Sequence, residues 1–207
     1  MLRLAIAFAI AITLTAACAP SATPAPTGRL KVVTTVAPLT NIVLNVGGNR
    51  IELTGIIPEG TDSHTFEPTP ADARLLAAAD LIILNGLNLE TPTEKLALAN
   101  KRASALIVKL GEQTVSQSEW IFDFSFPKEH GDPNPHLWMN VQYAMCYAEI
   151  ARDALAKVDP ANRAYYESNA KAYLALLDRL DKGIAQAAQT VPPPNRKLLT
   201  YHDSWAY

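Results

Sequence analysis

The sequence predicts an α/β protein: a parallel-sheet N-terminal lobe, a long linking helix, and only the first strand of a second α/β lobe. Short β-branched runs alternate with helical segments over residues 29–158, a pattern typical of βαβ units. A sustained helical stripe follows over residues 161–190, and one more apolar run comes after it. We therefore expect a first lobe at 29–158, a linking helix at 159–191 and the truncated start of a second lobe at 192–207.

Four runs rich in branched apolar residues are the expected strands of the first lobe. Each is bounded by glycine, proline or polar residues that end regular structure. The runs are Leu30–Thr35, Ile51–Ile57, Asp80–Gly86 and Ser104–Leu110. Because helices separate them, we expect the strands to be parallel and the sheet to be covered on both faces.

Helix start signals lie between these strands. The first helix is expected from about Pro38 to Val46, ending at a glycine pair. The next two helices each follow a Thr-Pro pair with an acidic residue three positions after the threonine, as in a capping box. These signals are Thr69, Pro70 and Asp72, then Thr91, Pro92 and Glu94.

The second half of the chain is expected to be a long loop and two helices. Residues 111–135 have no clear period, and loops of that length in compact domains are often functional. Asn140 caps a helix to about Val158, and Cys146 lies in it as a small core residue. A rod of about 45 Å follows over residues 161–190. The rod ends at a proline run, after which Leu198–Thr200 is the expected, loosely packed strand.

The N-terminus indicates export. Arg3 precedes an apolar run of about 14 residues, too short to span a membrane but typical of a signal peptide, which we place at residues 1–17. Small residues then precede Cys18, an arrangement that resembles a lipoprotein processing site with lipidation of Cys18. Thr15 stands where that site usually has leucine, so ordinary signal-peptidase cleavage stays open.

The segment after Cys18 favours a tether. Residues 18–28 are small, proline-rich and uncharged, and such a stretch forms a semi-extended spacer. We expect a domain anchored to the membrane and facing outward, or a periplasmic one. A net charge of −2 without basic clusters gives no indication of nucleic acid binding, and we expect a monomer.

Three of the four histidines lie in comparable places. His64 follows the second strand, His136 ends the long loop, and His202 follows the last strand. Ligands of open α/β sheets bind beyond the carboxyl ends of strands, and imidazole suits zinc and other first-row metals. The three therefore form a candidate metal site, although their spacing matches no compact motif and each alone could be a solvated side chain. His130 is left out as solvated.

Three acidic residues near these histidines are candidates for orienting the imidazoles. Metal-bound histidine usually donates its second N–H to an acceptor, and Asp62, Glu67 and Asp203 could accept it. Turn and capping roles are at least as consistent with the positions of Asp62 and Glu67.

Four segments of the chain resemble those of a known family. "DSHTFEPTP", "ADLIILNGLNLE", "NPHLWMN" and "YHDSWAY" are similar, in family order, to motifs of the zinc- and manganese-binding solute-binding proteins of bacterial ABC importers. Asn134 replaces the usual aspartate of the third motif. The resemblance covers essentially all of the chain after the leader.

The resemblance implies two α/β lobes joined by one rigid helix, with the metal in the cleft between them. Carried over, His64 and His136 are ligands from the first lobe and His202 is the first ligand from the second. The family's fourth ligand, commonly a late aspartate, has no counterpart before Tyr207. The implied partners are an ABC importer permease and its cytoplasmic ATPase, and no reaction is catalysed.

The resemblance favours zinc over manganese, because manganese-preferring members often have glutamate where His202 stands. Since protons compete for imidazole, we expect metal affinity to fall steeply below roughly pH 6. Two other functions stay open at this point. One is a three-histidine zinc hydrolase or hydratase with water in an open position, and the other is a metal-dependent surface adhesin.

Overall fold

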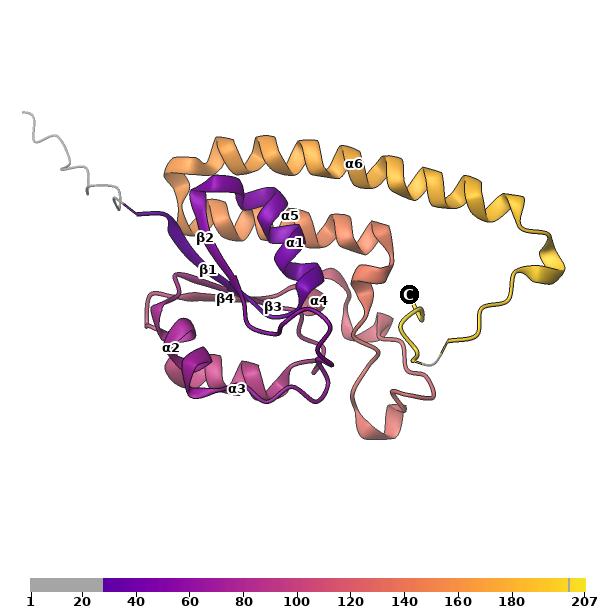
Figure 1. The fold of residues 1–207 in the computed structure, drawn as a ribbon, viewed down its shortest axis with the longest axis horizontal. Coiled ribbons are helices and arrows are strands. Elements are labelled where there is room, and N and C mark those ends of the chain that lie inside the picture. The colour runs from indigo at the N-terminus through magenta and orange to yellow at the C-terminus, as the bar shows by residue number, and fades with distance from the viewer. Residues whose placement is uncertain (1–27, 201) are drawn as a thin grey trace, which may run out of the picture.

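The computed structural model describes residues 28–200 and 202–207 (Figure 1). The expected signal peptide, Cys18 and all of the tether before Gly28 lie outside the described residues. The described chain contains a four-stranded parallel sheet in the order β2-β1-β3-β4. The strands are β1 (Leu30–Thr34), β2 (Ile51–Gly55), β3 (Leu81–Leu84) and β4 (Leu106–Lys109). The four predicted strands and their parallel direction are confirmed.

The central strand β3 explains why the sheet is buried on both sides. Its sequence, LIIL, is wholly apolar, and every residue in it has zero exposure. A strand covered on both faces needs such a continuous apolar run rather than an alternating one. Figure 1 shows α2 (Pro70–Ala78) and α3 (Thr91–Asn100) on one face of the sheet, with α1 (Ala37–Gly47) and α5 (Val141–Val158) on the other.

Two of the three expected caps are formed. The Thr69 hydroxyl and the Asp72 carboxylate make a reciprocal capping box at the start of α2, and the Asn140 side chain accepts from Gln142 N–H at the start of α5. The cap expected at Thr91 is wrong. Thr91 is already the first residue of α3, and the capping position belongs to Glu90, whose carboxylate points into the protein.

The long loop is more ordered than expected. The helix α4 (Leu110–Thr114) opens it, and two short 3-10 turns, Gln117–Glu119 and Lys128–His130, lie within it. Leu110 is the residue of α4 that packs into the core, and it is fully buried. A single helical turn held by one leucine gives too short an apolar pattern to be recognised in the sequence.

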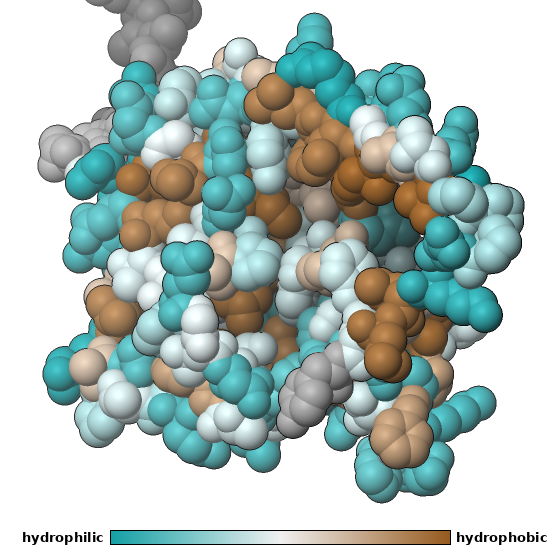
Figure 2. Space-filling view, turned by 45° about the vertical axis from the view of Figure 1, so that its right-hand side comes forward, coloured by the Kyte–Doolittle hydropathy of each residue, from teal (hydrophilic) through white to brown (hydrophobic). Residues whose placement is uncertain are grey.

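The linking helix, expected at residues 159–191, is α6 (Arg163–Thr190), and the 3-10 turn Pro160–Asn162 precedes it. Tyr166, Ala170 and Leu177 of its apolar stripe are buried, and they lie where α6 packs on α5 and α1. The same stripe continues into solvent, where Leu180 and Ile184 are each 52% exposed. The far half of α6 therefore runs past the first lobe, as Figure 1 shows. The surface turned forward in Figure 2 carries several hydrophobic patches separated by hydrophilic residues.

The chain after α6 differs from the expectation. It makes a 3-10 turn at Pro193–Asn195, and no described residue after that turn belongs to a strand. The strand expected at Leu198–Thr200 is not formed, because a strand needs a neighbour for its backbone groups and none pairs with this segment. The expected loose packing is seen, since Leu199 is 97% exposed whereas Ile83 has zero exposure.

Candidate metal centre

The structure brings three histidines together at one end of the sheet. His64 Nε2 lies 3.3 Å from His136 Nε2, and His202 Nε2 lies 3.2 Å from the same atom. One ligand nitrogen from each of the three residues falls within 4.8 Å of the others. These residues come from segments 72 and 66 positions apart in the chain, so only the tertiary fold assembles them.

Local structure positions each histidine differently. His64 is in the loop after β2, where the Asp62 carboxylate accepts the His64 N–H at 2.9 Å and closes a tight turn. His136 directly precedes the 3-10 turn Leu137–Met139 and is 6% exposed. His202 reaches the site from the segment that returns after α6 (Figure 1). The segments that contain His64 and His136 thus meet the returning segment that contains His202 at the end of the parallel sheet.

The nitrogen spacing fits a shared metal ion. Two imidazole nitrogens bound tetrahedrally to one zinc ion at ~2.0–2.1 Å lie roughly 3.3 Å apart. The two observed Nε2 separations from His136, 3.3 and 3.2 Å, agree with that value. Imidazole nitrogens at this separation can share one divalent cation when none of the three ligand nitrogens carries a proton.

Asn134 holds the ring of His136. Its Oδ1 atom lies 2.8 Å from His136 Nδ1 and also accepts the His136 backbone N–H at 3.0 Å. Because an amide oxygen only accepts, Nδ1 carries the proton and the Nε2 lone pair faces the other histidines. The Asn134 amide is fully buried, so this contact is shielded from water.

The site disfavours a proton on two of its imidazoles, those of His136 and His64. Burial, with the neighbouring His64 and His202, lowers the pKa of His136 to about 3. Burial and His202 also lower the pKa of His64, while Asp62 opposes them. At neutral pH both rings are therefore neutral and able to donate a lone pair.

Aromatic side chains form walls around the cluster. The ring of Phe126 has its centroid 5.5, 5.6 and 5.8 Å from those of His64, His136 and His202. Trp138 lies 5.2 Å from His136. Trp205, which follows His202 by three residues, is 55% exposed. Phe126 could not be singled out from the sequence, because it lies in the aperiodic part of the long loop.

None of the three acidic candidates accepts from an imidazole in the described residues. Asp62 binds backbone and Thr65, and the Asp203 carboxylate accepts from Ser125. Glu67 is exposed and makes no hydrogen bond to the cluster. The acceptor for an imidazole is instead Asn134, which was not among the candidates although it lies two residues before His136.

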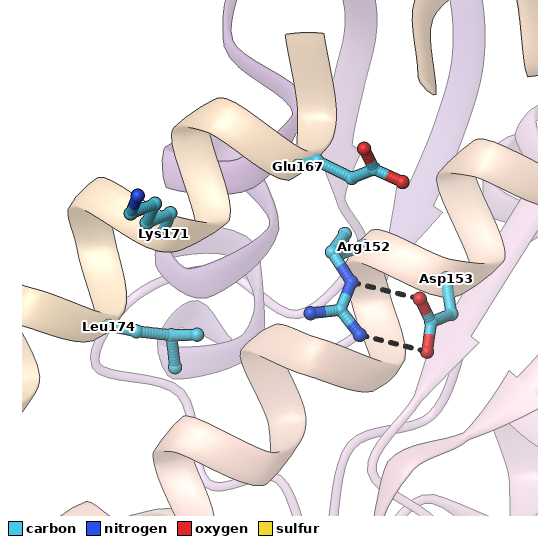
Figure 3. A pocket seen from close by; sticks show the side chains of 5 residues that line it. All are labelled: Arg152, Asp153, Glu167, Lys171 and Leu174. Atoms are coloured by element: carbon cyan, nitrogen blue, oxygen red, sulfur yellow. Dashed lines mark hydrogen bonds and ion pairs between the residues drawn. The ribbon is translucent and has the colours of Figure 1, made fainter. Parts of the chain in front are cut away.

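A pocket of about 260 Å³ opens beside His64. The Leu87–Leu89 turn, Phe126 and the exposed His130 are among its lining residues. A larger pocket of about 420 Å³ lies between α5 and α6 (Figure 3). There Asp153 binds the Arg152 guanidinium through both carboxylate oxygens, and none of the three histidines lines it. The candidate centre is therefore the cluster of His64, His136 and His202, and the smaller pocket lies beside it.

Comparison with known proteins identifies the family. The model of the ZnuA family, described as zinc-uptake complex component A, periplasmic, matches residues 32–207. The chain belongs to this family. The ZnuA-like fold, an α/β lobe with a parallel sheet and covering helices, is the one described above.

The relatives of this ZnuA-family chain are named for metal transport. It is 34% identical to the metal ABC transporter substrate-binding lipoprotein FimA of Streptococcus parasanguinis, over 92% of this chain and 62% of that protein. The manganese ABC transporter substrate-binding lipoprotein PsaA of Streptococcus anginosus gives the same identity and coverage. The chain thus spans about 62% of the length of these relatives, which are named as transport proteins and not as enzymes.

A solved structure of the family superposes on the chain. The periplasmic zinc-binding protein TroA of Treponema pallidum matches with a TM-score of 0.71 and 29% identity, over 80% of this chain and 57% of that one. The family membership confirms the resemblance seen in the four motifs, and the names of these relatives support neither a hydrolase nor an adhesin. Among the described residues no helix is both long and apolar enough for a membrane span.

Proposed function

We propose that this chain captures a divalent metal ion outside the cytoplasm and delivers it to an ABC importer permease driven by a cytoplasmic ATPase. His64, His136 and His202 are the proposed ligands. The observation that carries this proposal is the convergence of their nitrogens, with both neighbours 3.2–3.3 Å from His136 Nε2. The metal is cargo here, so the site has to bind and later release it.

We propose zinc over manganese as the cargo. All three candidate ligands are imidazole nitrogens, which suit zinc, whereas manganese sites favour carboxylate and other oxygen ligands. Within the described residues no carboxylate joins the cluster. The relatives are named for both metals, manganese for PsaA and zinc for TroA, so the donor set of this chain is what favours zinc.

We propose that a lipid on Cys18 anchors the protein to the outer face of the membrane. The cysteine follows an apolar leader directly, and a proline-rich spacer separates it from the sheet. FimA and PsaA are named lipoproteins, which supports this arrangement. The anchor keeps the metal site near a membrane permease while the spacer lets the domain reach it.

A zinc titration of the chain tests the proposal. A chromophoric chelator competing at pH 7.5 reports the affinity of the wild type and of the His64→Ala, His136→Ala and His202→Ala variants. Each substitution should weaken zinc binding by at least about tenfold, by analogy with the loss of supporting contacts around metal ligands. His130→Ala is the matched control, because His130 lies outside the cluster and should leave the affinity unchanged. Equal affinity in all four variants would rule out the histidine site.

A second titration with manganese tests the choice of metal. Zinc should bind more tightly than manganese, as the Irving–Williams order predicts for any site. The ratio of the two affinities should also be larger than at an oxygen-rich site, because all three proposed ligands are nitrogens. Equal or tighter manganese binding would overturn the zinc assignment but leave the histidine site standing.

A further inference from the structure

The side chain of Asn134 joins two of the proposed ligands. It is fully buried, and all four of its hydrogen-bonding positions are used. Its Oδ1 faces the backbone N–H and Nδ1 of His136, at 3.0 and 2.8 Å. Its Nδ2 donates to the Asp203 carbonyl at 2.7 Å and to the Asp123 carboxylate at 2.6 Å.

The backbone fixes which way this amide points. The His136 N–H is a donor and needs an oxygen, while the Asp203 carbonyl is an acceptor and needs an N–H. Turning the amide over would set donor against donor and acceptor against acceptor. Asn134 therefore has one orientation, with an acceptor arm to His136 and a donor arm to the residue that follows His202.

The donor arm is part of a closed ring of hydrogen bonds. The Asp203 carboxylate accepts from the Ser125 hydroxyl at 2.9 Å, and the Asp123 carboxylate accepts from the backbone N–H of Ser125 at 3.0 Å. Asn134 completes the ring by donating to both aspartates. Tyr207 adds an outer contact, since its hydroxyl accepts the Ile121 N–H at 3.1 Å. These bonds tie the returning segment to the long loop of the first lobe.

We propose that Asn134 is a positioning residue that holds His202 against His136 before a metal ion arrives. The inference rests on the proposed function, because it concerns how that site is assembled. Leu198 and Leu199 are 73% and 97% exposed, so the stretch of chain just before His202 does little to place the histidine. The hydrogen bonds of Asp203 to Asn134 and Ser125 supply the placement instead. A site assembled in advance loses less conformational freedom on binding and so binds more tightly.

The Asn134→Asp substitution separates the two arms. The carboxylate still accepts from His136, but at neutral pH it cannot donate to the Asp203 carbonyl and it repels Asp123. In the metal-free, chelator-treated chain, the ring protons of His136 and His202 should show a nuclear Overhauser contact in the wild type, since their centroids are 4.8 Å apart. That contact should be lost in the variant. Its persistence would overturn the proposal, whether or not the chain binds zinc.

Zinc affinity gives a second, independent measure. Asn134→Asp keeps the acceptor that orients His136 and removes the contact that places His202. It should therefore weaken zinc binding by about tenfold, the low end of the effect of losing a supporting contact around a metal ligand. His202→Ala should then cost much less in the Asn134→Asp background than in the wild type, because His202 is already displaced. Equal fold-losses in the two backgrounds would mean that Asn134 does not act through His202. A wild-type chain that binds no zinc would instead refute the proposed function, and the ring contact would still decide the role of Asn134.

The Ser125→Ala variant covers the case in which a buried charge at position 134 prevents folding. Ser125 is exposed, and the substitution removes only its hydroxyl bond to Asp203. We expect a weaker ring contact between His136 and His202, a smaller loss of zinc affinity than for Asn134→Asp, and an unchanged circular dichroism spectrum. Ser118→Ala is the matched control, since that hydroxyl bonds only to Ser116. If Ser125→Ala behaves like Ser118→Ala in both measurements, the hydrogen-bonded ring does not position His202.

Discussion

Replacing Glu90 by glutamine tests how the protein holds a buried carboxyl group close to the end of β3. Glu90 is 3% exposed, and its carboxylate accepts from the Thr35 hydroxyl at 2.7 Å and from the N–H groups of Asn85 and Gly86 at 2.6 and 3.2 Å. No ion pair of the described residues includes it. Burial raises the pKa of Glu90 to about 7, although these hydrogen bonds act in the opposite direction.

The raised pKa makes the stability of the protein depend on pH. The unfolded chain loses the Glu90 proton near pH 4.5, whereas the folded chain keeps it to about pH 7. The contribution of Glu90 to the free energy of unfolding is therefore greatest below pH 4.5, and it is lost as the pH rises toward 7. At about 1.4 kcal/mol per pH unit, the loss amounts to about 3 kcal/mol.

Glutamine removes this dependence and introduces a local cost. Its oxygen can replace the carboxylate oxygen that serves Thr35 and Asn85, but its NH₂ group then faces the N–H of Gly86. An unpaired buried donor costs about 1–3 kcal/mol. We expect Glu90→Gln to be less stable than the wild type by about that amount at pH 5. At pH 8 the difference should shrink by about 3 kcal/mol and can change sign.

Urea unfolding of the metal-free chain at pH 5 and pH 8, followed by circular dichroism, measures both differences. Glu52→Gln makes the same change of charge at an exposed position of β2 and should give equal effects at the two pH values. If the destabilisation by Glu90→Gln is the same at pH 5 and pH 8, the carboxyl group is not protonated in the folded state, and the reasoning from its burial is refuted.

Three further substitutions have definite expected outcomes. Because the pKa of His136 is lowered to about 3, only the unfolded chain takes up a proton at this residue, so the stability of the metal-free protein falls as the pH decreases below about 6.5. In urea unfolding, the difference in the free energy of unfolding between the wild type and His136→Gln should change by up to about 1.4 kcal/mol per pH unit. A difference that stays constant with pH would contradict this reasoning. Gly86→Ala should lower the melting temperature, because Gly86 has φ +79° and a new Cβ would collide with Glu112. The expected cost in the free energy of unfolding is above about 1 kcal/mol, and an unchanged melting temperature would contradict this prediction. Thr69→Ala removes the capping box of α2 and should cost about 0.5–2 kcal/mol in urea unfolding, and a wild-type midpoint would show that the cap is dispensable.

The fold of the first lobe was predictable because its signals are local. The LIIL run of β3 and the Thr-Pro-x-Asp start of α2 each determine their element within a few residues. The similar signal at Thr91 failed because Glu90, one residue earlier, makes its hydrogen bonds to Thr35 and Asn85 rather than to the start of α3. A tertiary contact between residues 55 positions apart overrides a local preference there, and a single sequence contains no measure of it.

The candidate site was predictable only in part. Each histidine could be singled out by its place after a strand or before a helix, and the four family-like motifs added the expectation that they meet. Asn134 lies two residues before His136, but its contact with Asp203, 69 residues away, could not be predicted from the sequence. The same holds for the contacts of Phe126 with His64 and His202. The expected strand at Leu198–Thr200 failed for the related reason that strands require partners, and no described segment pairs with it.

The electrostatics of the cluster change the expectation for pH dependence. Burial and the neighbouring imidazoles make a proton on His136 or His64 unfavourable, so the pKa values of these two residues are lowered. A divalent ion avoids that penalty because it accepts all three lone pairs at once. Metal binding at pH 7 then displaces few protons from these two rings. The steep loss of affinity expected below roughly pH 6 for ordinary imidazoles should accordingly begin at lower pH for this site.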